Sequence, residues 1–156
     1  MMTTVRHLRQ DAWFALLTAS LILLACGCSS FNRQWKHAAQ FPSPTHSMEG
    51  RWEGHWLSDV NGHNGKLLCI VSRQETGDYS AWFKATYKKV LKFSYTVPLI
   101  VDPLDTGWKF SGHEDLGKLA GGVYHYEGTA TATNFHSTYR SKYDHGVFEM
   151  TRPANP

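Results

Sequence analysis

The sequence predicts an all-β protein, a single antiparallel meander of eight strands that closes, or nearly closes, into a barrel. Aromatic residues make up 13% of the chain, and they are strand formers with large surfaces to bury. Apolar and polar residues alternate in short runs from residue 49 to residue 152, with turn clusters between the runs. An open sheet would leave two unpaired edges, so a barrel is favoured over the alternative, a two-sheet sandwich.

The expected strands follow one another with short connections. They are Glu49–Ser58, Lys66–Arg73, Tyr79–Lys88, Phe93–Val101, a short strand at Trp108 and Phe110, Val123–Thr131, Phe135–Lys142 and Val147–Arg152. Pro98 lies within the fourth of them, and its missing N–H predicts an edge position or a bulge. The segment His113–Gly122 is expected to be a loop.

The first 25 residues have the pattern of a signal peptide. Arg6 and Arg9 precede an uncharged, mostly apolar run of 14 residues, Ala12 to Ala25. This run is shorter than the ~20 residues that a membrane span needs. The sequence that follows it resembles a bacterial lipobox, which implies lipidation at Cys26, with Cys28 as the alternative. We therefore expect an exported lipoprotein of the cell envelope, anchored in a membrane by its N-terminal lipid. An outer-membrane position is compatible, because neither cysteine is followed by Asp.

The chain therefore divides into a signal peptide (1–25), a lipid-anchored tether (26–47) and a barrel domain (48–156). Pro42 and Pro44 break regular structure in the tether. Phe31 and Trp35 recur at helical spacing, which is typical of a short amphipathic helix. Such a helix lies either on the membrane surface or against one end of the domain.

Composition and motifs exclude several classes of function. The formal net charge is +3 and no basic stripe is present, so nucleic acid is not expected as a partner. No nucleophile elbow, phosphate loop or Cys-x-x-Cys occurs, so an enzyme is not expected either, and no cofactor is predicted. Cys69 stands alone in the body of the chain within an apolar run, and we expect it to be buried and free of disulfides.

One face of the strands combines large aromatic and small side chains, which suits a pocket for a small apolar or amphipathic ligand. Tyrosine hydroxyls on such a face need hydrogen-bond partners when they are buried. The candidate ligand-binding residues are Trp56, Phe83, Tyr87, Tyr95, Tyr124, Tyr126 and Tyr139. Small barrels are often solid, so these rings could equally fill the interior.

The start of the first strand resembles the Gly-x-Trp signature of calycin barrels, the group that contains lipocalins, avidins and nitrobindins. Gly50 and Trp52 carry the match. In those folds the tryptophan packs near the barrel floor against a basic residue of the last strand, which implies a contact between Trp52 and Arg152. The resemblance covers the two ends and the strand count. The lipocalin Thr-Asp-Tyr motif is missing, and Trp56 replaces a glycine of the nitrobindin pattern.

Two other functions stay open. A solid barrel without a cavity would act as a non-catalytic structural or interaction module of the envelope, using either the exposed Trp82 and the face of Lys84 and Lys88, or the loops. A haem- or metal-binding barrel would need suitably placed histidines. His55, His125 and His136 alternate out of phase with the aromatic face, so they are expected on the outside, where neighbouring strands could bring them together around zinc or copper.

Overall fold

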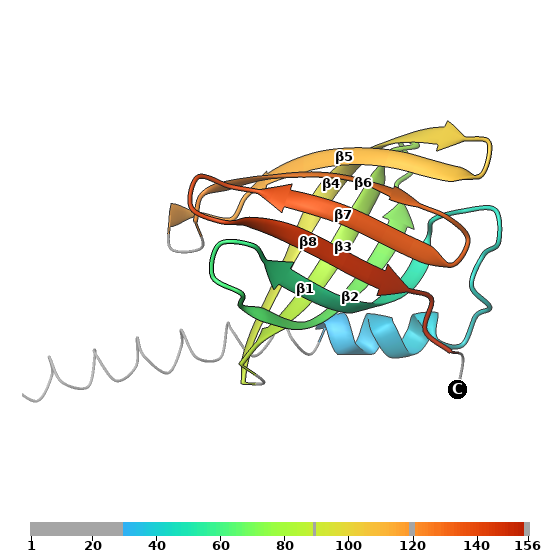
Figure 1. Cartoon of the computed structure of the whole chain (residues 1–156). Coiled ribbons are helices and arrows are strands. Elements are labelled where there is room, and N and C mark those ends of the chain that lie inside the picture. The colour runs from blue at the N-terminus through green and yellow to red at the C-terminus, as the bar shows by residue number, and fades with distance from the viewer. Residues whose placement is uncertain (1–29, 89, 119–120, 155–156) are drawn as a thin grey trace, which may run out of the picture. The chain divides into compact units, whose positions relative to one another are not determined.

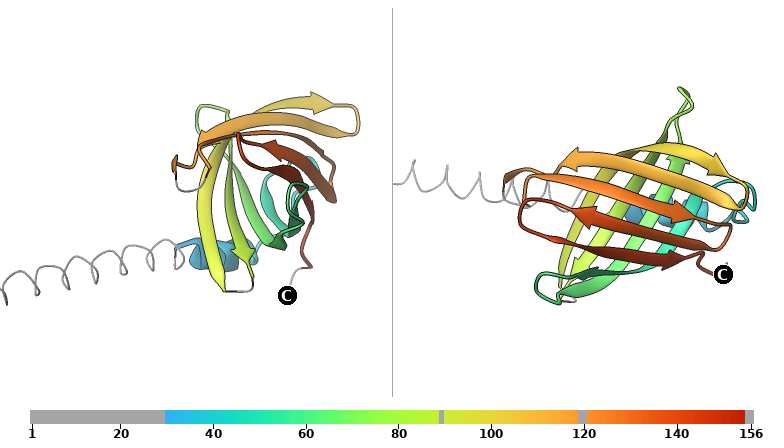
Figure 2. Two further views of the ribbon diagram at one scale, coloured as in Figure 1. Left: turned by 60° about the vertical axis from the view of Figure 1, so that its left-hand side comes forward. Right: turned by 45° about the horizontal axis from the view of Figure 1, so that its top comes forward.

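Eight antiparallel strands form one meander that closes into a barrel in the computed structural model, which describes residues 30–88, 90–118 and 121–154 (Figure 1). The predicted fold class is confirmed. The strands are β1 Gly50–Ser58, β2 Asn64–Arg73, β3 Tyr79–Tyr87, β4 Leu91–Leu104, β5 Gly107–Asp115, β6 Val123–Ala130, β7 Asn134–Arg140 and β8 His145–Thr151. Each pairs with its sequence neighbours, and β1 also pairs with β8 to close the sheet. Figure 2 shows this closure from two further sides.

Two strands extend beyond their predicted limits. β4 has 14 residues and β5 has 9, so the predicted loop His113–Gly122 is a loop only from residue 116. Pro98 pairs with Ser80 of β3, whereas the pairing of β4 with β5 begins one residue later, at Leu99. Pro98 therefore stands where β4 has no ladder partner on its β5 side, and its missing N–H removes no bond there.

One end of the barrel is closed by buried side chains, and we call this end the floor. Met48 and Trp52 are fully buried there, and the Trp52 indole Nε1 donates a hydrogen bond of 2.9 Å to the Met48 carbonyl. The guanidinium of Arg152 lies 3.7 Å from the centre of the Trp52 ring. The contact that the resemblance implied is thus present. Gly50 has a φ of 99°, and a Cβ there would lie 3.1 Å from Arg152 Nη1.

Arg152 also ties the segment before β1 to the end of β8. Its Nη2 donates to the Ser47 carbonyl at 2.8 Å, and its Nη1 donates to the Glu49 carbonyl. Burial lowers the pKa of Arg152 to about 10, which still leaves the side chain charged at neutral pH.

Cys69 is free and fully buried, as expected, and burial raises the pKa of its thiol well above the usual value.

A helix over residues 30–38 precedes the barrel, as the spacing of Phe31 and Trp35 predicted. Residues from Trp35 onward belong to the same compact unit as the barrel, and the Trp35 ring lies 5.2 Å from the guanidinium carbon of Arg51. Among the described residues, no helix is long and apolar enough to cross a membrane. The predicted signal peptide and the two lipidation candidates, Cys26 and Cys28, lie outside the described residues.

The outer face of β3 differs from the expectation. Trp82 is half-buried and its indole donates to the Ser94 hydroxyl at 2.8 Å, while Lys84 is only 7% exposed. Lys84 therefore does not belong to an exposed face with Lys88, and the predicted Trp82/Lys84/Lys88 interaction surface is wrong in this respect.

Candidate functional site

Aromatic rings from five strands meet inside the barrel. The centre of the Phe83 ring lies 5.5 Å from that of Phe148 and 6.3 Å from that of Tyr126. The centre of the Tyr139 ring lies 5.0 Å from that of Phe148, and the centre of the Tyr95 ring lies 5.4 Å from that of Phe83. These contacts cross from β3 to β6 and β8, so the rings fill the middle of the barrel rather than lining an open channel.

The end opposite the floor is less tightly covered, and we call it the mouth. Four inward-facing aromatic rings are half-buried there: Trp56, Tyr87, Tyr95 and Tyr124. They come from the end of β1, the end of β3, the start of β4 and the start of β6. Glu114, near the end of β5, is also half-buried and pairs across the sheet with Tyr124. The mouth therefore combines flat apolar surfaces with the carboxylate of Glu114.

The tyrosine hydroxyls near the mouth differ in their partners. Tyr139 donates to the Asp144 carboxylate at 3.3 Å, and that carboxylate also accepts a 2.6 Å bond from Ser58. The Tyr87 hydroxyl lies 3.2 Å from a ring nitrogen of His63. In contrast, the Tyr126 side chain is 2% exposed, and its hydroxyl has no hydrogen-bond partner among the described residues. A buried hydroxyl without a partner is uncommon in folded proteins and costs about 1–3 kcal/mol.

Neighbouring groups act on the Tyr126 hydroxyl without satisfying it. Burial raises the pKa of Tyr126 well above its usual value, and the nearby Tyr124 and Glu114 contribute to the increase. Burial also raises the pKa of Tyr95, with a further contribution from Tyr126. The two hydroxyls interact, since the Tyr95 hydroxyl partly offsets the raised pKa of Tyr126 while Tyr126 adds to the raised pKa of Tyr95. Their geometry nevertheless falls outside the limits of a hydrogen bond. Tyr126 therefore stays protonated at neutral pH and can donate a hydrogen bond.

The barrel wall parts beside this hydroxyl. In the described ladders, Leu91 to Pro98 of β4 pair with β3 alone, Leu99 pairs with both neighbours, and Ile100 to Leu104 pair with β5 alone. Correspondingly, the end of β5 from His113 to Asp115 pairs with β6 alone. The two strands separate toward the mouth, on the side where Tyr95 and Glu114 lie. This separation allows the mouth to widen without breaking backbone hydrogen bonds between β4 and β5.

Trp56 is held in position by a neighbouring strand. Its indole Nε1 donates to the Thr86 carbonyl at 3.1 Å, beyond the end of the β2–β3 ladder at Leu67 and Ala85. Gly65 of β2 lies beneath this bridge, and a Cβ there would stand 2.9 Å from the indole nitrogen. A glycine within a strand is the sequence signal for such a close approach.

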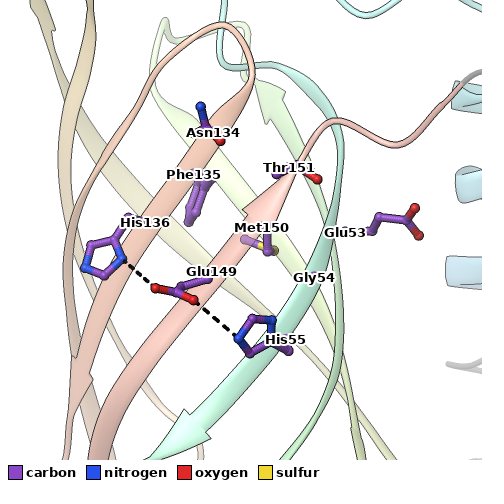
Figure 3. Close-up of a pocket in the computed structure, with 9 residues that line it drawn as sticks. All are labelled: Glu53, Gly54, His55, Asn134, Phe135, His136, Glu149, Met150 and Thr151. Carbon is purple, nitrogen blue, oxygen red and sulfur yellow. Dashed lines mark ion pairs between the residues drawn. The ribbon is translucent and has the colours of Figure 1, made fainter.

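A second candidate is a surface pocket of about 420 Å³ on the outside of β1, β7 and β8 (Figure 3). Glu149 lies between two histidines in this pocket, one on each neighbouring strand. Its carboxylate oxygens lie 3.3 Å from His55 Nε2 and 3.9 Å from His136 Nδ1. The structure thus brings together two of the three histidines that the sequence placed outside. The third, His125, pairs with His113 instead, with ring centres 5.9 Å apart.

The outer pocket is a weaker candidate than the mouth. The side chains of His55, Glu149 and His136 are each more than half exposed, and the Phe135 and Met150 side chains beneath them turn into the core. A small molecule there would stay largely in water, whereas ligand sites typically bury most of their ligand. Within the described residues, no three histidine, cysteine or carboxylate side chains converge as a metal site requires. The histidines of the described strands are all exposed, so none enters the barrel as a haem ligand would.

The seven candidate ligand-binding residues all face the interior but lie at two depths. Trp56, Tyr87, Tyr95 and Tyr124 are half-buried at the mouth, and Phe83, Tyr126 and Tyr139 are buried below them. The sequence reasoning missed Glu114, which completes the mouth. Glu114 follows Phe110 and Gly112 at alternate positions, so all three side chains lie on the same face of the strand. This spacing could have identified Glu114 as an inward-facing residue.

No protein-family model matches the chain. No curated protein matches it. No solved structure matches it.

Proposed function

We propose that the barrel, in the lipid-anchored envelope protein that the leader predicts, reversibly binds one small amphipathic molecule at its mouth. The apolar body of the ligand would lie among the half-buried rings, and one polar atom would accept a hydrogen bond from Tyr126. The observation that carries this proposal is the buried Tyr126 hydroxyl, which lacks a partner among the described residues. A ligand that supplies an acceptor would remove the cost of leaving this donor unpaired.

The chemistry of the mouth narrows the class of ligand. Tyr126 remains a donor at neutral pH, so the ligand needs an acceptor such as a carbonyl, ether or hydroxyl oxygen. Glu114 interacts electrostatically with the same tyrosine, and its negative charge disfavours a carboxylate at that position. Trp56 and Tyr124 provide flat apolar walls. A neutral polar group on a flat or flexible apolar body fits best.

The calycin resemblance supports the same reading. The eight-stranded meander and the contact between Trp52 and Arg152 at the floor are the features that the Gly-x-Trp signature implied. We therefore extend the proposal to a calycin-like barrel that is closed at the floor and binds at the opposite end.

The test compares two tyrosines that differ in the partner of the hydroxyl. The probe is Prodan, a neutral amphipathic naphthalene whose ketone accepts hydrogen bonds and whose emission reports its surroundings. In Tyr126→Phe we expect the affinity for Prodan to fall by ~3- to 10-fold, the effect of one neutral hydrogen bond. The free energy of unfolding without probe should stay the same or rise by about 1 kcal/mol, because a buried unpaired hydroxyl is removed.

Tyr139→Phe is the matched control, because the Tyr139 hydroxyl already donates to Asp144. It should lower the free energy of unfolding by about 1 kcal/mol and leave Prodan affinity unchanged. The proposal fails if Tyr126→Phe binds Prodan as tightly as the parent chain. If the parent chain binds no Prodan at all, a solid barrel that acts as an interaction module replaces the proposal.

A further inference from the structure

Large apolar side chains are exposed around the mouth on all four chain connections at that end. The connections are β1–β2, β3–β4, β5–β6 and β7–β8, and Figure 1 shows them toward its left. Val90 is 77% exposed and Tyr143 is 68% exposed. We define the rim as the large apolar residues that are at least 43% exposed on these connections or on the strand ends beside them. They are Val60, Val90, Leu91, Phe93, Val123 and Tyr143.

Lysines are interleaved with the rim. Lys88 and Lys92 flank Val90 and Leu91 in the sequence, and both are exposed. Lys142 is next to Tyr143, with its amino nitrogen 5.0 Å from the centre of that ring. Long lysine side chains can place their stems along apolar surface while the amino group stays in a polar layer.

The turns at the two ends of the barrel carry different charges. Those at the floor end contain Glu75, Asp78 and Asp105 and, among the described residues between strands, no lysine or arginine. The connections at the mouth contain three lysines, Lys88, Lys118 and Lys142, and two aspartates, Asp59 and Asp144. The Asp144 carboxylate already accepts hydrogen bonds from Ser58 and Tyr139. The connections that carry the apolar rim are therefore more basic than the turns at the floor.

We propose that the rim docks on an anionic lipid surface, so that the mouth faces the bilayer. Apolar side chains would enter the interface, Tyr143 would lie at the level of the headgroups, and the lysines would meet anionic phosphates. This inference goes beyond ligand binding and does not require the barrel to hold a ligand.

The arrangement of the rim favours a lipid surface over a protein partner. Lysine is depleted from the cores of protein interfaces, whereas lysines alternate with the exposed apolar residues here. The rim residues also come from four separate connections at one end of the barrel. A planar layer can contact all four connections at once.

The experiment places an environment-sensitive nitrobenzoxadiazole label at one of two positions in the full chain. The background carries Cys26→Ser and Cys28→Ser, and the buried Cys69 is not labelled in the folded protein. Val90→Cys puts the label on the rim, and Leu104→Cys puts it at the opposite end of β4 at a residue that is 53% exposed. Both proteins have the same leader, so a difference between them reports orientation.

With vesicles of phosphatidylcholine and phosphatidylglycerol, we expect a blue shift and stronger emission at position 90 and no change at position 104. The shift should be lost on phosphatidylcholine alone and in the double variant Lys88→Glu/Lys92→Glu. Adding Leu91→Asp should also abolish it, whereas Leu104→Asp should not. Leu91 is 54% exposed, so these two substitutions are matched in exposure.

Three outcomes would overturn the inference. Equal shifts at both positions would show that the mouth does not face the bilayer. An equal shift at position 90 on neutral vesicles would remove the role of anionic lipid. A shift at position 90 that appears without vesicles as protein concentration rises would assign the rim to contact between protein copies.

Discussion

At the scale of single residues, Trp52 and Arg152 together hold the floor of the barrel. The Trp52 ring is fully buried, donates to the Met48 carbonyl and lies against the Arg152 guanidinium. A cation–π contact of this kind contributes about 2 kcal/mol when it is removed from water. The indole therefore joins the core, the segment before β1 and the end of β8.

Trp52→Ala should lower the free energy of unfolding by ~3–5 kcal/mol, because it leaves a cavity and removes the ring from Arg152. Trp82→Ala should cost much less, since that ring is half-buried on the outside of β3. Urea unfolding of both variants measures the difference. Equal costs would mean that the floor contact contributes little to stability.

The aromatic residues of the site were predictable from sequence, but their depth was not. Alternation fixes the face on which Phe83 and Tyr87 lie, since successive side chains point to opposite sides of a strand. Whether a ring is buried depends on its distance from the barrel end, which requires the register of all eight strands. The missing partner of Tyr126 is likewise a tertiary property, because it depends on side chains from β4, β5 and β6.

At the scale of elements, the seam between β1 and β8 depends on close backbone approach at Gly54. Gly54 pairs with Met150, and a Cβ at this position would overlap the Glu149 carbonyl and lie 2.7 Å from the Met150 Cα. Both of those atoms are backbone, so relief would require the two strands to move apart.

Gly54→Ala should lower the free energy of unfolding by about 1–3 kcal/mol, the usual cost of overpacking. His55→Ala, at the next and exposed position, should change it by less than about 0.5 kcal/mol, because exposed pairs such as His55–Glu149 contribute little. Hydrogen exchange should localise the loss to β1 and β8. Unchanged protection there in Gly54→Ala would contradict a tight seam.

The predicted strand boundaries are correct where apolar and polar residues alternate regularly, and they are wrong where this alternation stops. β3 begins and nearly ends as expected, because large and small apolar residues alternate through it. β5 was expected to be short because its inward positions after Phe110 are Gly112 and Glu114, which break the apolar pattern. β4 continues through Pro98 because the missing N–H has no ladder partner on the β5 side.

At the scale of the whole molecule, buried acidic groups give stability a defined dependence on pH. The pKa values of Cys69, Tyr95, Tyr126 and Tyr139 are all raised, in each case chiefly by burial. Above the ordinary pKa values, about 8.5 for Cys and 10 for Tyr, the unfolded chain releases protons that the folded chain retains. These groups therefore favour the folded state fully at neutral pH, and this contribution is lost as pH rises.

Arg152 has the opposite sign, because its lowered pKa of about 10 lets the unfolded chain hold the proton to higher pH. With four groups against one, the free energy of unfolding should fall as pH increases above about 9. Chemical denaturation at a series of alkaline pH values measures this slope. Tyr126→Phe should make it shallower, and the exposed Tyr143→Phe should not. If Tyr126→Phe leaves the slope of unfolding free energy against pH unchanged, the Tyr126 phenol is not buried and protonated as described.

The bond between Arg152 and the carbonyls of Ser47 and Glu49 has a consequence for biosynthesis. The residue that secures the start of the barrel follows the last strand in the sequence, so it is made after all eight strands. Until then β1 lacks β8, and the floor lacks its cation. Closure of the barrel therefore requires synthesis to continue through Arg152, and any truncation before this residue should leave both β1 and β8 open to proteases.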